Sequence, residues 1–175
     1  MNHQYTLNVS TTGAFRVDIP TYCKNAPFIE LPPGSSEGIF TINPDEAFNS
    51  EWLHHVNSVL PAPIVGAFAF KRTANRKSIH SDFYPPHRMF LYALNFLIQP
   101  QQSRMMWYNI AGEVVDEVDI PSDRLLLVNT AQWHDVDVGG VERWCVSLRP
   151  ADCIYDPANP LGWDQIVKKY QHLLF

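Results

Sequence analysis

The sequence lacks the features of several large protein classes. Its three cysteines form no C-x-x-C pair, which argues against a disulfide framework or a structural zinc site. No run of about 18 apolar residues indicates a membrane span. No basic cluster extends beyond Lys71-Arg72 and Arg76-Lys77, so the chain has no electrostatic footprint for nucleic acid. We therefore expect reduced thiols and neither a membrane nor a nucleic-acid partner.

The composition is that of a folded, water-soluble chain. Hydrophobic residues make up 46% of the sequence and charged residues 18%, with a net charge of -5. A length of 175 residues suits one domain and is too short for two ordinary ones, so we expect a single domain over residues 1–175. The first residues have neither a basic start nor an apolar stretch of signal-peptide length, which favours a cytoplasmic protein. The sequence leaves homo-oligomerisation open.

The pattern of short apolar runs predicts an all-β fold. Proline makes up 14 of the 175 residues, a larger share than the ~5% of an average chain. The prolines separate runs rich in β-branched and aromatic residues. Such runs, spaced by turn residues, are typical of sandwiches and barrels. The predicted strands cover residues 5–9, 28–31, 64–70, 89–98, 105–109, 113–118, 124–129 and 142–149.

Two helices are predicted to flank the sheets. The first begins at Asn43, a capping residue, with Pro44 at the first helical position, and ends before Pro61. The second covers residues 163–174. The apolar residues on one helical face are Phe48, Trp52, Val56 and Val59 in the first helix, and Trp163, Ile166, Val167, Tyr170 and Leu174 in the second.

A histidine and an aspartate stand two residues apart just before the apolar segment 89–98. On an extended chain, His80 and Asp82 point to the same face, so they can bind one ion together. The alternative is a surface loop before Pro85-Pro86 whose polar residues face water. H-x-D is a common spacing, so a metal site needs a third ligand from elsewhere.

His134 is the candidate for that third ligand. It follows an apolar strand and begins another short extended segment, where an antiparallel neighbour can bring it back to His80 and Asp82. Two imidazoles and one carboxylate are the ligand set favoured by non-haem Fe(II) that must also bind a co-substrate and dioxygen. The H-E-x-x-H pattern of many zinc hydrolases and the H-x-H pair of cupin dioxygenases are both absent.

The last predicted strand adds two arginines to the same region. Alternation places Arg143, Cys145, Ser147 and Arg149 on one face. A buried arginine needs an anion, which a dicarboxylate co-substrate would supply through a bidentate contact. An ordinary ion pair with a neighbouring strand is the alternative.

These residues resemble a known pattern. His80-x-Asp82, His134 and Arg143 are similar to the H-x-D…H…R arrangement of the Fe(II)- and 2-oxoglutarate-dependent oxygenases. The stretches HRMFLYALNFLI, SRMMWYN and LLLVNTAQWHDVDVGGVERWCVSLRP look in particular like the aspartyl/asparaginyl β-hydroxylase-like branch. The resemblance covers about residues 64–150.

The resemblance implies a double-stranded β-helix, the jelly roll also found in cupins, with its core at 64–150 and flanking segments at 1–63 and 151–175. It implies His80, Asp82 and His134 as iron ligands, Arg143 as the partner of 2-oxoglutarate, and Arg88 near the substrate. The branch often has glycine in place of Asp82. Many oxygenases have serine two residues after the arginine, whereas this chain has Cys145 there and Ser147 two residues further on. Arg143 and Arg149 therefore both remain candidates for the co-substrate.

Other polar and aromatic residues are candidates for the lining of the site. Asn95 either lines the cavity or is a satisfied core amide. Trp107, with the neighbouring methionines, either closes a substrate pocket or belongs to the core. We expect Asn95, Ser147 and Tyr108 near the co-substrate. For Tyr108 the reason is that a buried tyrosine hydroxyl needs a partner.

The predicted function is that of a 2-oxoglutarate-dependent non-haem iron dioxygenase, with Fe(II) as cofactor and 2-oxoglutarate as co-substrate. It would hydroxylate a small-molecule or peptidyl substrate with dioxygen and release succinate and CO2. The alternative is a non-catalytic jelly-roll module that binds a small molecule or a protein. Nothing in the sequence identifies the substrate.

Overall fold

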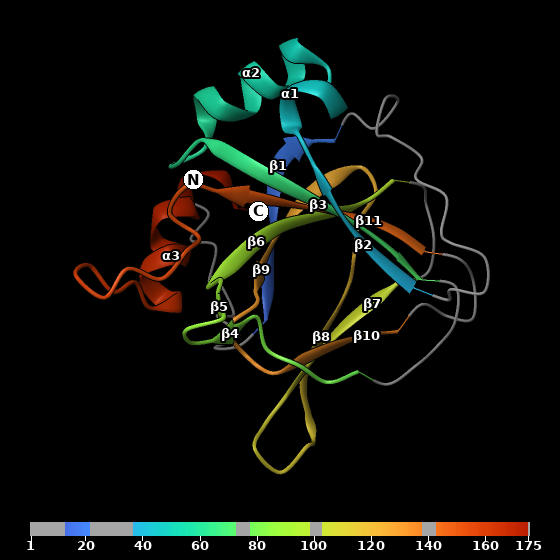
Figure 1. The fold of residues 1–175 in the computed structure, drawn as a ribbon, viewed down its shortest axis with the longest axis vertical. Helices are drawn as coiled ribbons and strands as arrows, with labels where there is room; N and C mark the ends of the chain where they lie inside the picture. The colour runs from blue at the N-terminus through green and yellow to red at the C-terminus, as the bar shows by residue number, and fades with distance from the viewer. Residues whose placement is uncertain (1–12, 22–36, 73–77, 99–102, 138–142, 175) are drawn as a thin grey trace, which may run out of the picture.

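Antiparallel strands dominate the computed structural model, and few helices accompany them (Figure 1). The structure describes residues 13–21, 37–72, 78–98, 103–137 and 143–174. The strands are β1 (Ala14–Pro20), β2 (Glu37–Ile42), β3 (Ile64–Arg72), β4 (Phe83–Tyr84), β5 (Arg88–Met89), β6 (Tyr92–Leu97), β7 (Arg104–Tyr108), β8 (Val114–Asp119), β9 (Arg124–Asn129), β10 (His134–Asp137) and β11 (Arg143–Pro150). The helices are α1 (Pro44–Ala47), α2 (Ser50–Val59), α3 (Trp163–Tyr170) and the 3-10 turn η1 (Gln171–Leu173).

The strands form one large and two small sheets. The large sheet has six strands in the order β1-β9-β6-β11-β3-β2, and a smaller one has the order β10-β7-β8. Strands β4 and β5 form a two-stranded ribbon. Every strand pair is antiparallel. The prediction of a β-rich fold is therefore confirmed.

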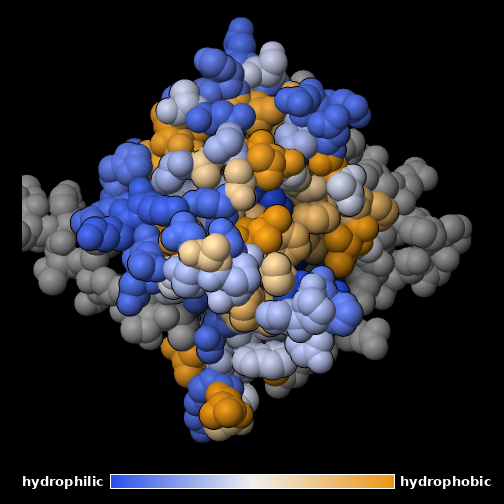
Figure 2. All heavy atoms as spheres, turned by 60° about the vertical axis from the view of Figure 1, so that its left-hand side comes forward, coloured by the Kyte–Doolittle hydropathy of each residue, from blue (hydrophilic) through white to orange (hydrophobic). Residues whose placement is uncertain are grey.

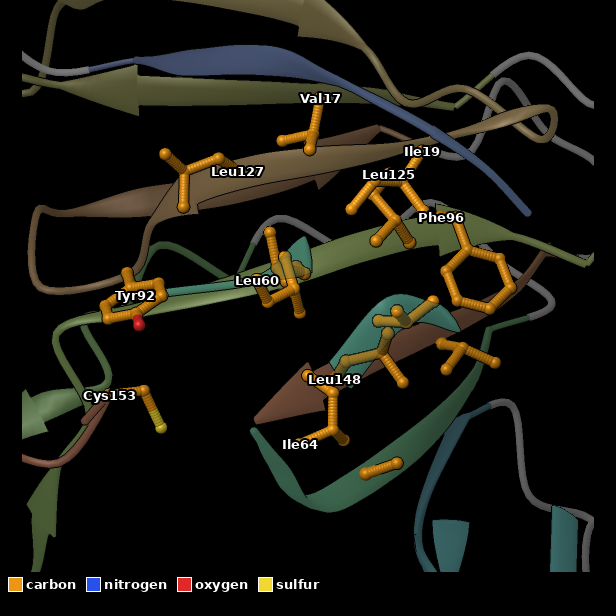
Figure 3. Close-up of a cluster of buried hydrophobic side chains, with 14 of the residues drawn as sticks. Val17, Ile19, Leu60, Ile64, Tyr92, Phe96, Leu125, Leu127, Leu148 and Cys153 are labelled. Atoms are coloured by element: carbon orange, nitrogen blue, oxygen red, sulfur yellow. The ribbon is translucent and has the colours of Figure 1, made fainter. Parts of the chain in front are cut away.

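Alternating side chains separate the large sheet into two faces with different neighbours. One face packs with α2 and α3, and Figure 3 shows Val17, Phe96, Leu127 and Leu148 from four of its strands around a shared interior. The opposite face packs against the three-stranded sheet β10-β7-β8. The buried hydrophobic residues between these two sheets form a second core cluster of Leu97, Met105, Trp107, Ile120, Leu126, Val128 and Cys145. The second face also carries the polar residues of the candidate site.

The first predicted helix is two helices in the structure. Phe48 is extended (φ -114, ψ 154) and ends α1, and the Asn49 side chain then accepts hydrogen bonds from the amides of Glu51 (2.9 Å) and Trp52 (3.1 Å) at the start of α2. A second capping residue thus restarts the helix. The second predicted helix is confirmed as α3, followed by η1.

Strand predictions 64–70, 105–109, 113–118, 124–129 and 142–149 correspond to β3, β7, β8, β9 and β11. The strand predicted at 89–98 is present over residues 92–97 as β6, but its first residues do not belong to it, because the chain changes partners at residues 90 and 91. Phe90 donates to the Asp82 carbonyl (3.2 Å) and Leu91 to the Cys153 carbonyl (2.8 Å), which separates β5 from β6. Strands β1 and β2 were not predicted, and the predictions at 5–9 and 28–31 lie outside the described residues.

The described surface includes a projection with both hydrophobic and hydrophilic side chains. The β7–β8 hairpin extends from the molecule, and Figure 2 shows hydrophobic side chains at its tip. Within the described ranges, no helix has the length and apolarity needed to cross a bilayer.

Candidate active site

Two histidines from distant parts of the sequence meet at the edge of the small sheet. His80 donates its amide to the His134 carbonyl (2.9 Å), and His134 donates its amide to the His80 carbonyl (2.7 Å). This antiparallel bridge extends the sheet beyond β10 and brings the two imidazole rings to 4.5 Å between centroids. The predicted contact between the two segments is therefore present.

Asp82 completes a group of three metal-binding side chains. The ligand atoms of His80, Asp82 and His134 all lie within 4.8 Å of one another, and His80 Nε2 is 3.9 Å from Asp82 Oδ1. The backbone holds the aspartate in place, since its amide donates to the Thr130 carbonyl (2.8 Å) just after β9. The structure thus brings together the three residues that the sequence predicted as ligands.

Backbone contacts set the protonation of both imidazoles. His80 Nδ1 lies 2.7 Å from the Ser78 carbonyl, and His134 Nδ1 lies 2.8 Å from the Gln132 carbonyl. A carbonyl only accepts, so each Nδ1 donates its proton there, and Nε2 is the nitrogen that carries the lone pair in the neutral form of each imidazole. Burial, together with the nearby His80, lowers the pKa of the His134 imidazole to about 4. Both contacts are those of metal-ligating histidines.

The three side chains line a cavity of about 570 Å³ between the large sheet and β10. The second face of β11 contributes Arg143, Cys145, Ser147 and Arg149, as strand alternation predicted. Asn95 also lines the cavity, opposite Ser147 in the register of β6 and β11, and its Oδ1 is buried without a hydrogen-bond partner among the described residues. The cavity wall therefore includes a buried polar atom, Asn95 Oδ1, that could accept a hydrogen bond from a bound molecule.

Arg149 is already paired. Its Nη2 lies 3.3 Å from Asp82 Oδ2, and its guanidinium stacks 4.4 Å from the Phe90 ring centroid and 5.4 Å from that of Phe68. Its Nη1 also donates to the Tyr92 carbonyl (3.5 Å). These contacts fix the position of the Asp82 carboxylate and pair the positive charge of Arg149 with it.

Arg143 is in the opposite situation. It is 6% exposed, and within the described part of the chain its Nε has no hydrogen-bond partner and its guanidinium forms no ion pair with a carboxylate. Burial lowers the pKa of its guanidinium from the ordinary value, and Arg72, its register partner on β3, lowers it further, while Cys145 opposes the shift. Of the two arginines that the sequence left open, Arg143 is the one with charge available for a bound anion.

Of the remaining predicted residues, one lines the cavity and two do not. Arg88 is exposed and lines the cavity. Trp107 does not line it, because the ring is fully buried in the second core cluster and its indole donates to the Asn129 carbonyl (2.9 Å). Tyr108 does not line it either, and its hydroxyl lies 3.9 Å from Met106 Sδ. The geometry thus gives no support to the predicted roles of Trp107 and Tyr108.

Sequence reasoning missed a buried ion pair beside the site. Asp135 follows His134 on β10 and is 3% exposed, and its Oδ1 lies 3.5 Å from Arg72 Nη1. The strand reads His-Asp-Val-Asp, so its composition does not distinguish Asp135 from the exposed Asp137 as the buried acid. The partner could not be read from the sequence, because Arg72 lies on a distant strand.

Comparisons with known proteins give similarity to solved structures but no match at the level of sequence families. No family model matches the sequence, and no curated protein matches it. A crystal structure of a prolyl-4-hydroxylase from Pseudomonas putida is similar with a TM-score of 0.42 and 16% sequence identity, over 69% of this chain and 76% of that chain. A similarity at this level identifies neither a family nor an activity, and nothing in it favours the β-hydroxylase-like branch.

Proposed function

We propose that the protein is an Fe(II)- and 2-oxoglutarate-dependent dioxygenase. The observation that carries the proposal is the combination of His80, Asp82 and His134 with a buried Arg143, which forms no ion pair with a carboxylate of the described residues, in the wall of one cavity. The three metal-binding side chains alone, or the buried arginine alone, would have simpler explanations. Together they provide a cation site and an anion site, which a metal-chelating dicarboxylate needs.

The donor set fits iron. Two neutral imidazoles and one carboxylate from one side of a cavity are the ligands of non-haem Fe(II) enzymes, and they leave coordination positions for other groups. The Nδ1 atoms of His80 and His134 lie against backbone carbonyls, which leaves Nε2 of each ring as the nitrogen for a metal. Fe(II), when bound, would supply the oxidative chemistry in which 2-oxoglutarate and dioxygen give succinate, CO2 and a hydroxylated product.

The other polar residues of the cavity have separate tasks in this proposal. Arg143 binds the distal carboxylate of 2-oxoglutarate with two charge-assisted hydrogen bonds. Asn95 and Ser147, which face each other across β6 and β11, offer further polar contacts to the co-substrate. Arg149 holds Asp82, so that the carboxylate keeps its place beside the two histidines.

The fold agrees with the proposed class. A large and a small antiparallel sheet with the site between them suit a double-stranded β-helix, the jelly roll that the resemblance implies. Arg88, exposed at the cavity, is the proposed contact for a small-molecule or peptidyl substrate. The β-hydroxylase-like branch remains a prediction from the sequence.

The competing function is a non-catalytic binding module of the same fold. It would use the cavity for an anion at Arg143 without needing a metal. The two functions differ in whether binding of 2-oxoglutarate depends on the metal. In the oxygenase the metal chelates the co-substrate, so tight binding needs the metal; in the binding module it does not.

Calorimetric titration of 2-oxoglutarate separates the two functions. The titration uses apo-protein and Mn(II)-loaded protein, since Mn(II) occupies such sites without reacting. The oxygenase predicts at least a tenfold gain in 2-oxoglutarate affinity with metal, and a smaller gain for glutarate, which lacks the chelating keto group. Equal affinity for both acids with and without Mn(II) would favour the binding module.

A further inference from the structure

Asp135 is a buried acid that the proposed chemistry does not use. It lies on β10 directly after His134 and is 3% exposed. Its Oδ1 accepts from the Val136 amide (2.8 Å) and lies 3.5 Å from Arg72 Nη1, and its Oδ2 accepts from the Ser78 amide (3.0 Å). Every described contact of this carboxylate is with a donor.

The contact with Ser78 links Asp135 to the other histidine. Ser78 lies two residues before His80, and its carbonyl is the acceptor for His80 Nδ1 (2.7 Å). Asp135 therefore holds, through the amide of Ser78, the residue whose carbonyl orients the His80 ring. His134 has no such dependence, because its Nδ1 acceptor is the Gln132 carbonyl on its own segment.

Arg72 contacts the buried carboxylate from a distant strand. The guanidinium reaches Asp135 from β3 and also donates to the Val136 carbonyl (2.9 Å), so β3 and β10 are joined at this point. A cation and two amide donors give both oxygens of this buried carboxylate a donor. An amide side chain cannot replace it, because its NH2 group would face a donor on one side.

We infer that Asp135 is a positioning residue for His80, which it orients through Ser78. The inference rests on the proposed function, in which His80 is a metal ligand. Loss of Asp135 frees Ser78, and the His80 ring then loses the fixed acceptor that directs its Nε2 toward the metal. Groups that orient a metal-bound histidine typically contribute about 10- to 100-fold to metal affinity. Asp135 acts one residue further away, so we expect a loss of about tenfold.

The test uses Co(II), which shifts the NMR signals of protons near it far outside the ordinary range. Each metal-bound imidazole with a protonated Nδ1 gives one shifted signal that disappears in D2O. Wild-type protein should give two. The His80 signal is the one that exchanges faster, because the His80 side chain is 43% exposed and His134 is 4% exposed.

Asp135→Asn should broaden or remove the His80 signal, leave the His134 signal in place and weaken Co(II) binding about tenfold. Asp137→Asn is the matched control, because Asp137 is the exposed acid at the end of the same strand. It should leave both signals and the Co(II) affinity unchanged. A variant Asp135→Asn that keeps both signals and wild-type affinity would overturn the inference.

Two further outcomes keep the inference separate from the proposed function. Wild-type protein that binds Co(II) without any exchangeable histidine signal would contradict the proposed function itself. If Asp135→Asn does not fold, hydrogen exchange on the wild type gives the answer. The Ser78 amide should then be strongly protected although Ser78 is an exposed residue, and rapid exchange at Ser78 would overturn the inference.

Discussion

Replacing Arg143 with methionine should weaken co-substrate binding and stabilise the apo-protein. The residue is 6% exposed, and its Nε has no partner among the described residues. A bidentate contact to a carboxylate contributes two charge-assisted hydrogen bonds of about 1.5–3 kcal/mol each. Their loss is about 3–6 kcal/mol, which corresponds to roughly 140- to 20,000-fold weaker 2-oxoglutarate binding.

The stability of the apo-protein should change in the opposite direction. A buried charge without a carboxylate partner costs free energy, so an apolar side chain of similar length should raise the free energy of unfolding by about 1–4 kcal/mol. Methionine fits because it is unbranched and adapts to irregular space. Urea unfolding of metal-free protein measures this change, and calorimetry with Mn(II)-loaded protein measures the change in 2-oxoglutarate affinity.

Arg149→Met is the matched control. Arg149 lies on the same face of β11 but is paired with Asp82 at 3.3 Å. Its removal leaves a half-buried carboxylate without its cation, so it should lower the free energy of unfolding by about 3 kcal/mol. The reasoning would be refuted if Arg143→Met lowered stability and left 2-oxoglutarate affinity unchanged, because Arg143 would then be a structural residue.

Three further predictions concern other residues of the site and the core. His134→Ala should reduce Fe(II) binding to background while urea unfolding stays cooperative, and an unchanged iron stoichiometry would remove His134 from the site. Trp107→Phe should lower the free energy of unfolding by about 1–3 kcal/mol, since it leaves the Asn129 carbonyl without the indole donor; a change in substrate or 2-oxoglutarate affinity instead would restore its predicted role. Burial raises the pKa of the Cys145 thiol and raises that of Cys153 to about 11, so both are protonated at pH 8 and iodoacetamide should label them only after denaturation. Rapid labelling of the native protein, located by mass spectrometry, would contradict their burial.

Local patterns predicted some of the strands that surround the site, β2 and β10 not among them. The apolar run of β9 and the alternation of β11 were visible in the sequence, and the alternation placed Arg143 and Arg149 on one face. Strand β1 also alternates, with Val17 and Ile19 buried, but its short apolar pattern lies between charged residues and was not identified. The break between β5 and β6 could not be predicted, because a partner in the loop after β11 causes it.

The candidate ligands could be predicted because ligand type and order along the chain are sequence properties. Their supporting contacts could not. The pairing of Arg149 with Asp82 and of Arg72 with Asp135 joins residues far apart in the sequence, and charge alone does not say which acid meets which base. The pairing of Arg149 with Asp82 is why we propose Arg143 rather than Arg149 as the anion site, and it could be known only from the structure.

Anaerobic titration of apo-protein with Fe(II) and then 2-oxoglutarate tests the central claim most directly. Chelation of Fe(II) by a 2-oxo acid gives a visible metal-to-ligand charge-transfer band. The oxygenase assignment predicts a band that saturates at one equivalent of Fe(II), is absent in His134→Ala and requires far more 2-oxoglutarate in Arg143→Met. No band in the wild type, with iron left unbound, would contradict the assignment.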